Sequence, residues 1–159
     1  MTHITTFLNN HKLYLSVLTL MVIVGSSRFL IGFIEITGES MSPTLTSGDW
    51  TLVLKKNGPF PRGSILLVRP KTSETLFVKR LIGQPGERLE FKDGYLYIND
   101  KKTEEPYVKE YIDDYTFPKV TVPQGHIFVL GDNRFYTEDS RHWGSVPVER
   151  IHGRVLCRF

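Results

Sequence analysis

Residues 88–100, RLEFKDGYLYIND, decide the fold class of this chain. The residues on either side of Asp93-Gly94, 89–92 and 95–98, are short runs rich in apolar and aromatic side chains, as strands with a buried face are. The Asp-Gly pair readily adopts the positive φ angles that a two-residue hairpin turn requires. This stretch therefore predicts an antiparallel β-hairpin.

Similar short runs lie on both sides of the hairpin, at 51–54 (TLVL), 64–68 (SILLV), 75–83 (TLFVKRLIG), 126–132 (HIFVLGD) and 150–156 (RIHGRVL). Most of the nine prolines stand in the gaps between runs, where they end strands and begin turns. The polar and charged stretch 101–122 predicts a segment that extends away from the apolar core. We therefore expect a mainly β, antiparallel, barrel-like domain over residues 29–159.

An apolar run, LYLSVLTLMVIV, occupies residues 13–24 and predicts a membrane anchor within residues 1–28. As a helix, residues 13–27 would span about 22 Å, less than the ~30 Å hydrocarbon core, so the helix would begin earlier and Lys12 would reach toward the headgroups. Lys12 favours a cytoplasmic amino terminus and a domain outside the cytoplasm. A cleaved secretory signal and a buried core helix are the two alternatives.

The charge pattern and the cysteine and histidine content of the chain argue against nucleic-acid binding, an internal disulfide and a metal site. The chain has 159 residues and a net charge of +3, and its basic residues come singly or in pairs with acidic residues between the pairs, so no nucleic-acid-binding stripe is present. Cys157 is the single cysteine and leaves no internal disulfide. No Cys/His cluster indicates a metal, although a catalytic pair of Cys157 with one of the five scattered histidines remains formally open.

Three segments carry candidate chemistry: 38–45 (GESMSPTL), 78–87 (VKRLIGQPGE) and 130–144 (LGDNRFYTEDSRHWG). A serine such as Ser40 is a poor nucleophile until a base takes its proton. Lys79 stands in an apolar strand, where burial would lower its pKa; a shift from ~10.4 to ~8 costs about 3 kcal/mol. Taken singly, Ser40 also reads as a turn residue and Lys79 as a solvated charge at a strand end.

Together and in this order, the three segments resemble type I signal peptidases, the membrane-bound Ser/Lys proteases that remove leader peptides from exported proteins. The resemblance covers the apolar segment and essentially the whole domain. It rests on the patterns S-M-S-P-T-L, K-R-x-x-G-x-P-G-E and G-D-N-R-x-x-x-x-D-S-R-x-W-G.

The resemblance implies Ser40 as nucleophile and Lys79 as general base, with the Thr137 hydroxyl orienting the lysine amine. It also implies an ion pair of Asp139 with Arg141 that holds the loop, where an ordinary surface pair is the alternative. Substrate would add as a strand between residues 33–38 and 76–78. The pockets for small side chains would be lined by Ile36, Met41, Leu45, Phe77 and Val78.

One position departs from the family pattern. Some members carry a serine two residues before the nucleophile, where it helps to bind the oxyanion, and this chain has Gly38 there. The backbone N–H of Ser40 is then the remaining donor.

The implied reaction is acyl transfer without a metal or organic cofactor. The implied partners are signal-peptide-bearing preproteins and membrane lipid, with no nucleic acid, and the implied location is the cell membrane in a single pass. Three alternatives stay open: a specialised conjugative or pilin-maturing peptidase of the same clan, a self-cleaving repressor, and a membrane-tethered binding module without catalysis. The repressor would require a DNA-binding domain and a cytoplasmic location.

Overall fold

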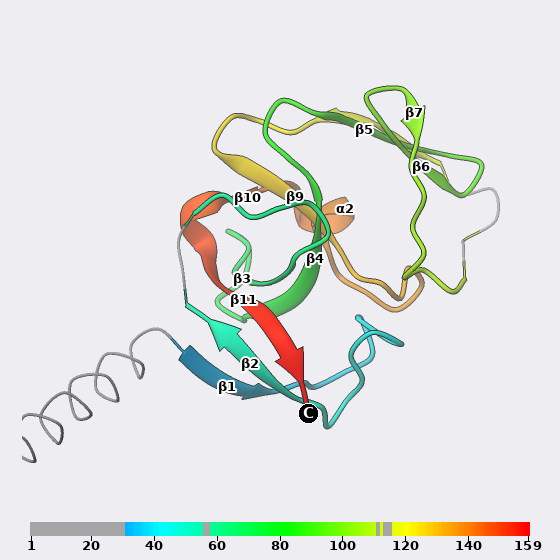
Figure 1. Cartoon of the computed structure of the whole chain (residues 1–159). Coiled ribbons are helices and arrows are strands. Elements are labelled where there is room, and N and C mark those ends of the chain that lie inside the picture. Colours follow the sequence, from blue (N-terminus) through cyan, green and yellow to red (C-terminus); the bar gives the residue numbers. More distant parts are fainter. Residues whose placement is uncertain (1–30, 56–57, 111, 113–115) are drawn as a thin grey trace, which may run out of the picture.

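The computed structural model describes residues 31–55, 58–110, 112 and 116–159. These residues form two antiparallel β-sheets joined by short turns, with one short α-helix and one 3₁₀ turn (Figure 1). The prediction of a mainly β, antiparallel domain is confirmed.

The larger sheet has seven strands in the order β1-β2-β11-β3-β4-β9-β10. Their bounds are β1 Ile31–Glu35, β2 Trp50–Leu54, β3 Ile65–Val68, β4 Phe77–Gly83, β9 His126–Leu130, β10 Val146–Pro147 and β11 Ile151–Arg158. In the described part of the chain β1 and β10 end the sheet and do not pair, so the sheet does not close, contrary to the barrel-like expectation. β10 is too short to close it, and Pro147 has no backbone N–H to add to a ladder.

The smaller sheet has the order β7-β6-β5-β8 and contains the hairpin, as predicted. Its strands are β5 Arg88–Lys92, β6 Tyr95–Ile98, β7 Lys101–Lys102 and β8 Phe117–Thr121. Asp93 and Gly94 have φ angles of 50° and 81°, as the tight turn requires. The stretch 101–122 is thus more than an excursion, because it supplies both edge strands, and an edge strand such as β8 tolerates Pro118.

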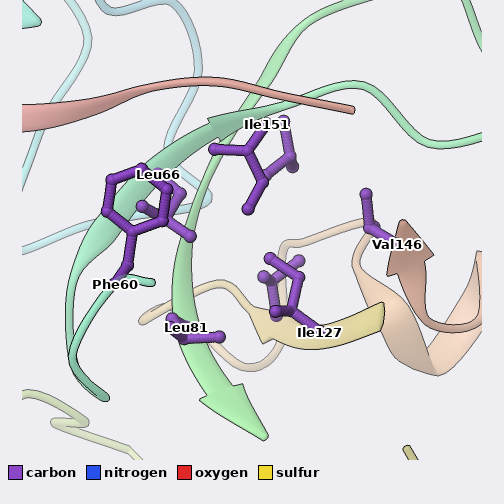
Figure 2. Close-up of a cluster of buried hydrophobic side chains, with 8 residues drawn as sticks. Phe60, Leu66, Leu81, Ile127, Val146 and Ile151 are labelled. Atoms are coloured by element: carbon purple, nitrogen blue, oxygen red, sulfur yellow. The ribbon is translucent and has the colours of Figure 1, made fainter. Parts of the chain in front are cut away.

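Two apolar clusters fix the geometry of β4. The first packs on one face of the larger sheet and includes Phe60, Leu66, Leu81, Ile127, Val146 and Ile151, whose side chains converge in Figure 2. The second joins the two sheets and contains Ile82, Phe128 and Leu130 from β4 and β9 together with Leu89, Phe91, Leu96 and Ile98 from the hairpin. Because both clusters hold β4, the residues at the start of this strand are firmly placed.

Two short helical elements complete the described fold, α2 at Ser140–Trp143 and the 3₁₀ turn η1 at Val148–Arg150. No helix among the described residues has the length and apolar character needed to cross a membrane. The anchor predicted within residues 1–28 lies outside the described residues.

We expect Gly153→Ala to lower the free energy of unfolding by about 1–3 kcal/mol, because the added methyl group would overpack the contact between the neighbouring strands β11 and β2. A Cβ at Gly153 would lie 2.6 Å from Val53 Cγ1 and 2.7 Å from the carbonyl oxygen of Leu54. Gly32→Ala is the matched control, since its Cβ would meet the flexible end of Lys55 at 3.3 Å. Urea denaturation of both variants measures the difference, and equal midpoints would contradict the prediction.

Candidate active site

The side chains of Ser40 and Lys79 meet although they come from distant parts of the sequence. Ser40 lies in a turn within the segment 36–49 that connects β1 to β2, and Lys79 lies near the start of β4, paired in register with Leu66. Lys79 Nζ donates a hydrogen bond to Ser40 Oγ over 2.7 Å. Only 2% of Lys79 is exposed, whereas Ser40 is half-buried and lines an open cleft. A buried amine therefore touches an accessible hydroxyl.

Burial lowers the pKa of Lys79 from its ordinary 10.5 to about 8. The carboxylates of Asp139, Glu138 and Asp132 favour the ammonium and act in the opposite direction, but burial outweighs them. At pH 7 about a tenth of the amine is then neutral, roughly three hundred times more than for an unperturbed lysine. The amine can therefore accept a proton at neutral pH.

Hydrogen bonds hold the turn around Ser40 on both sides. The Asn133 N–H donates to the carbonyl oxygen of Ser40 over 3.2 Å. Thr44 donates its hydroxyl to Asp132 over 2.5 Å, and Arg80 pairs with the same carboxylate through Nε at 2.8 Å and Nη2 at 2.5 Å. Because Arg80 follows Lys79 in β4, one carboxylate ties the nucleophile turn to the strand that carries the amine.

The loop at residues 131–139 approaches Ser40 closely because residue 131 is glycine. A Cβ at Gly131 would lie 2.3 Å from Thr137 Oγ1 and 2.4 Å from the carbonyl oxygen of Ser40. Thr137 therefore lies beside the turn. Its hydroxyl donates to the carbonyl of Glu138 at the long distance of 3.5 Å, and in the described part of the chain it makes no hydrogen bond to Lys79. The orienting role of Thr137 stays a prediction.

Asp139 and Arg141 form a buried ion pair. Arg141 donates to Asp139 through Nε and Nη2, each over 2.9 Å, and the Asp139 side chain is fully buried. Asp139 also accepts the N–H of Gly131 over 3.1 Å and caps α2. Arg141 in turn donates to the carbonyl of Arg134 over 3.0 Å. The pair thus ties both ends of the loop together.

A cleft of about 220 Å³ runs from Ser40 between β1 and β4. Four of the five residues predicted to form substrate pockets line it, namely Ile36, Met41, Phe77 and Val78. Leu45 does not line the cleft but packs beneath it, against Ile36 and Met41. Its contribution is to support the pocket floor.

Sequence reasoning left two supporting residues without a role, Arg80 and Glu105. Arg80 follows Lys79 in the K-R pattern, a signal that could have pointed to a partner carboxylate. Glu105 is 2% exposed and forms a bidentate ion pair with Arg134, whose two Nη atoms donate to its carboxylate over 2.8 and 2.6 Å. It lies in the polar stretch 101–122, where no pattern marks it for burial. No group of His, Cys, Asp and Glu within the described ranges could hold a metal ion.

Comparison with known proteins connects this geometry to a family. The model of the family described as signal peptidase, peptidase S26, matches residues 10–159. Signal peptidase I of Bacillus caldolyticus is 40% identical over 147 residues, covering 82% of this chain and 80% of the relative. Signal peptidase I U of Bacillus subtilis strain 168 is 46% identical over 125 residues, covering 72% and 67%.

The fold agrees with this relationship. A signal peptidase I structure from Enterococcus faecalis V583 superposes with a TM-score of 0.57 at 33% identity, over 64% of this chain and all of that chain. Family match, identity and fold agree, and this chain belongs to the signal peptidase family, peptidase S26.

Proposed function

We propose that this chain removes signal peptides from exported proteins, with Ser40 as nucleophile and Lys79 as general base. The observation that carries the proposal is the 2.7 Å contact between the buried Lys79 amine, whose pKa is lowered to about 8, and the Ser40 hydroxyl at the cleft. A base and a nucleophile within hydrogen-bond reach are what covalent catalysis requires.

The first step is attack on the scissile carbonyl. Neutral Lys79 takes the proton of the Ser40 hydroxyl, and Ser40 Oγ bonds to the carbonyl carbon. The resulting ammonium then gives the proton to the leaving amine, and an ester to Ser40 remains. In the second step Lys79 takes a proton from water as the water oxygen bonds to the ester carbonyl carbon. The bond from that carbon to Ser40 Oγ then breaks, the Lys79 ammonium returns its proton to Ser40 Oγ, and the signal peptide leaves with a free carboxyl end.

The backbone N–H of Ser40 is the donor that we assign to the oxyanion. Gly38 stands where a second donor could act, with a φ angle of 86° and open space where a side chain would point. This φ lies in the left-handed region that glycine adopts readily, so the shape of the turn itself favours glycine there.

The cleft supports an extended substrate. β1 is the terminal strand of its sheet, and β9 pairs with β4 only from Arg80 onward, which leaves Phe77 and Val78 without a partner on that side in the described ladders. A peptide strand can add along these edges. The cleft has a volume of only about 220 Å³, and the almost fully buried side chains of Ile36 and Met41 line it, which favours small residues before the cut.

We further propose that residues 1–28 anchor the domain in the cell membrane, with the amino terminus in the cytoplasm. The apolar run 13–24 supports this. On the larger sheet Phe33, Trp50 and Phe159 are 63%, 51% and 72% exposed, and the rings of Phe33 and Phe159 lie 6.2 Å apart. Such an exposed aromatic surface suits contact with lipid. The anchor would hold enzyme and preprotein in one membrane and raise their effective concentration.

Ser40→Ala and Lys79→Ala should each abolish cleavage of a secretory precursor in detergent, and the double variant should be no worse, because the two side chains act as one unit. Ser47→Ala, an exposed serine of the same segment, is the matched control and should keep most activity. Clear cleavage by either single variant would refute the Ser/Lys assignment.

Activity should rise with pH along a limb centred near pH 8. The neutral amine is the active form, and its fraction grows as the pH passes the lowered pKa of Lys79, about 8. Lys79→Arg should be inactive throughout, since a guanidinium stays protonated. The measurement is kcat/KM for a peptide substrate from pH 6 to 10. A flat profile would identify another group as the base.

The burial that activates Lys79 should also destabilise the fold at neutral pH. The folded-state pKa of about 8 lies below the unfolded value, so the unfolded chain binds more protons between roughly pH 8 and 10.5, and stability should rise with pH there. Relative to Lys79→Met, which removes the titration, the wild type should gain about 2 kcal/mol between pH 7 and 9.5. Parallel urea denaturation curves at both pH values measure this, and an identical pH dependence of the two proteins would contradict it.

A further inference from the structure

The cleft between β1 and β4 accounts for only one side of a substrate. Most of its lining comes from residues 34–37, which precede Ser40, and from residues 76–79, with Ser40, Met41 and Leu67 completing it. A polypeptide bound there with its scissile carbonyl at Ser40 must continue past the nucleophile, because the enzyme cuts within a chain. The residues after the cut therefore lie beyond Ser40, outside this cleft.

A second hollow, of about 150 Å³, lies on that side. It shares no lining residue with the cleft and is formed by Ser42, Pro43, Lys109, Glu110 and residues 132–134. Ser42 and Pro43 directly follow the nucleophile turn, and the Asn133 N–H donates to the Ser40 carbonyl over 3.2 Å. The hollow thus adjoins the turn that holds Ser40, where the part of a substrate after the cut could enter it.

The outer wall of this hollow is firmly held. The segment that leads from β7 comes down beside the loop at residues 131–139 (Figure 1). Glu105 binds Arg134 through two buried hydrogen bonds and accepts the Tyr107 hydroxyl over 3.0 Å. The Arg80 guanidinium lies 4.1 Å from the centre of the Tyr107 ring, and Val108 is buried. Lys109 and Glu110 therefore extend from an anchored segment.

The charges of the hollow divide into two kinds. Asp132 is bound by Arg80 and Thr44, and Arg134 is bound by Glu105, so these charges are compensated within the protein. Lys109 and Glu110 are exposed at the rim. A peptide that passes through the hollow meets these two side chains as charges of opposite sign.

We propose that this hollow binds the first residues after the scissile bond, with Lys109 attracting acidic and Glu110 attracting basic side chains there. The inference rests on the proposed function, since it assigns the leaving-group side of the same site. It makes the segment at residues 105–110, between β7 and β8, a determinant of which mature amino termini are released fastest.

The test compares two peptide substrates that are identical except at the second residue after the cut, which is Glu in one peptide and Lys in the other. The readout is the ratio of kcat/KM for the Glu peptide to that for the Lys peptide, which is insensitive to a general loss of folding. Lys109→Glu should lower this ratio about five- to fifteen-fold. The contact of residue 109 with each of the two peptides changes sign, so the ratio changes by about four times the energy of one modest exposed contact. Glu110→Lys should raise it by a similar factor.

Two controls locate the effect. Lys101→Glu reverses an exposed lysine of β7 outside the hollow and should leave the ratio unchanged. Placing the same Glu and Lys before the cut should give ratios that Lys109→Glu does not alter. Unchanged ratios in both hollow variants, with wild-type cleavage intact, would overturn the inference while leaving the proposed function in place. Absence of precursor cleavage by the wild type would overturn the proposed function, and this inference with it.

Discussion

The burial of one amine organises this protein. Lys79 occupies a position in β4 at which an apolar residue would pack without cost, and its ammonium has lost nearly all contact with water. Buried cations are destabilising unless they are paired or lose their proton. Here the Ser40 hydroxyl is the hydrogen-bond partner and the surrounding carboxylates compensate only in part. The cost of burying this incompletely compensated charge lowers the pKa of the amine, so that part of it is unprotonated and able to accept a proton at neutral pH.

The buried carboxylates near this amine are each held by an ion pair and further hydrogen bonds. Asp132 joins Arg80 to Thr44, Asp139 joins Arg141 to the loop backbone, and Glu105 receives Arg134. Removing one partner of such buried pairs leaves an uncompensated charge, which costs far more than an exposed pair contributes. The network therefore keeps the turn that holds Ser40 and the loop at residues 131–139 in one arrangement.

The predictions from sequence succeeded where a local pattern has a local cause. Asp93-Gly94 demanded a hairpin because few other pairs adopt its backbone angles, and the motif segments indicated which serine and lysine would meet. Contacts between residues far apart in the chain leave no such local pattern in the sequence. The burial of Glu105 depends on Arg134, 29 residues away, and reads in the sequence as one more charge in a polar stretch. Leu45 and Phe77 look alike as apolar residues, and only the fold decides that one supports the cleft and the other lines it. Sheet closure failed as an expectation because it depends on the pairing of strands at opposite ends of the order.

The place of β11 in the larger sheet bears on how the enzyme matures. β11 lies between β2 and β3, so it joins the half that carries Ser40 to the half that carries Lys79. Its residues, Ile151–Arg158, come after those of every other described strand in the sequence. Until they have emerged and paired, the two halves lack their common strand. The two halves that carry Ser40 and Lys79 therefore share a complete sheet only after every other described strand has been translated, so translation order places the assembly of the site after the synthesis of β11.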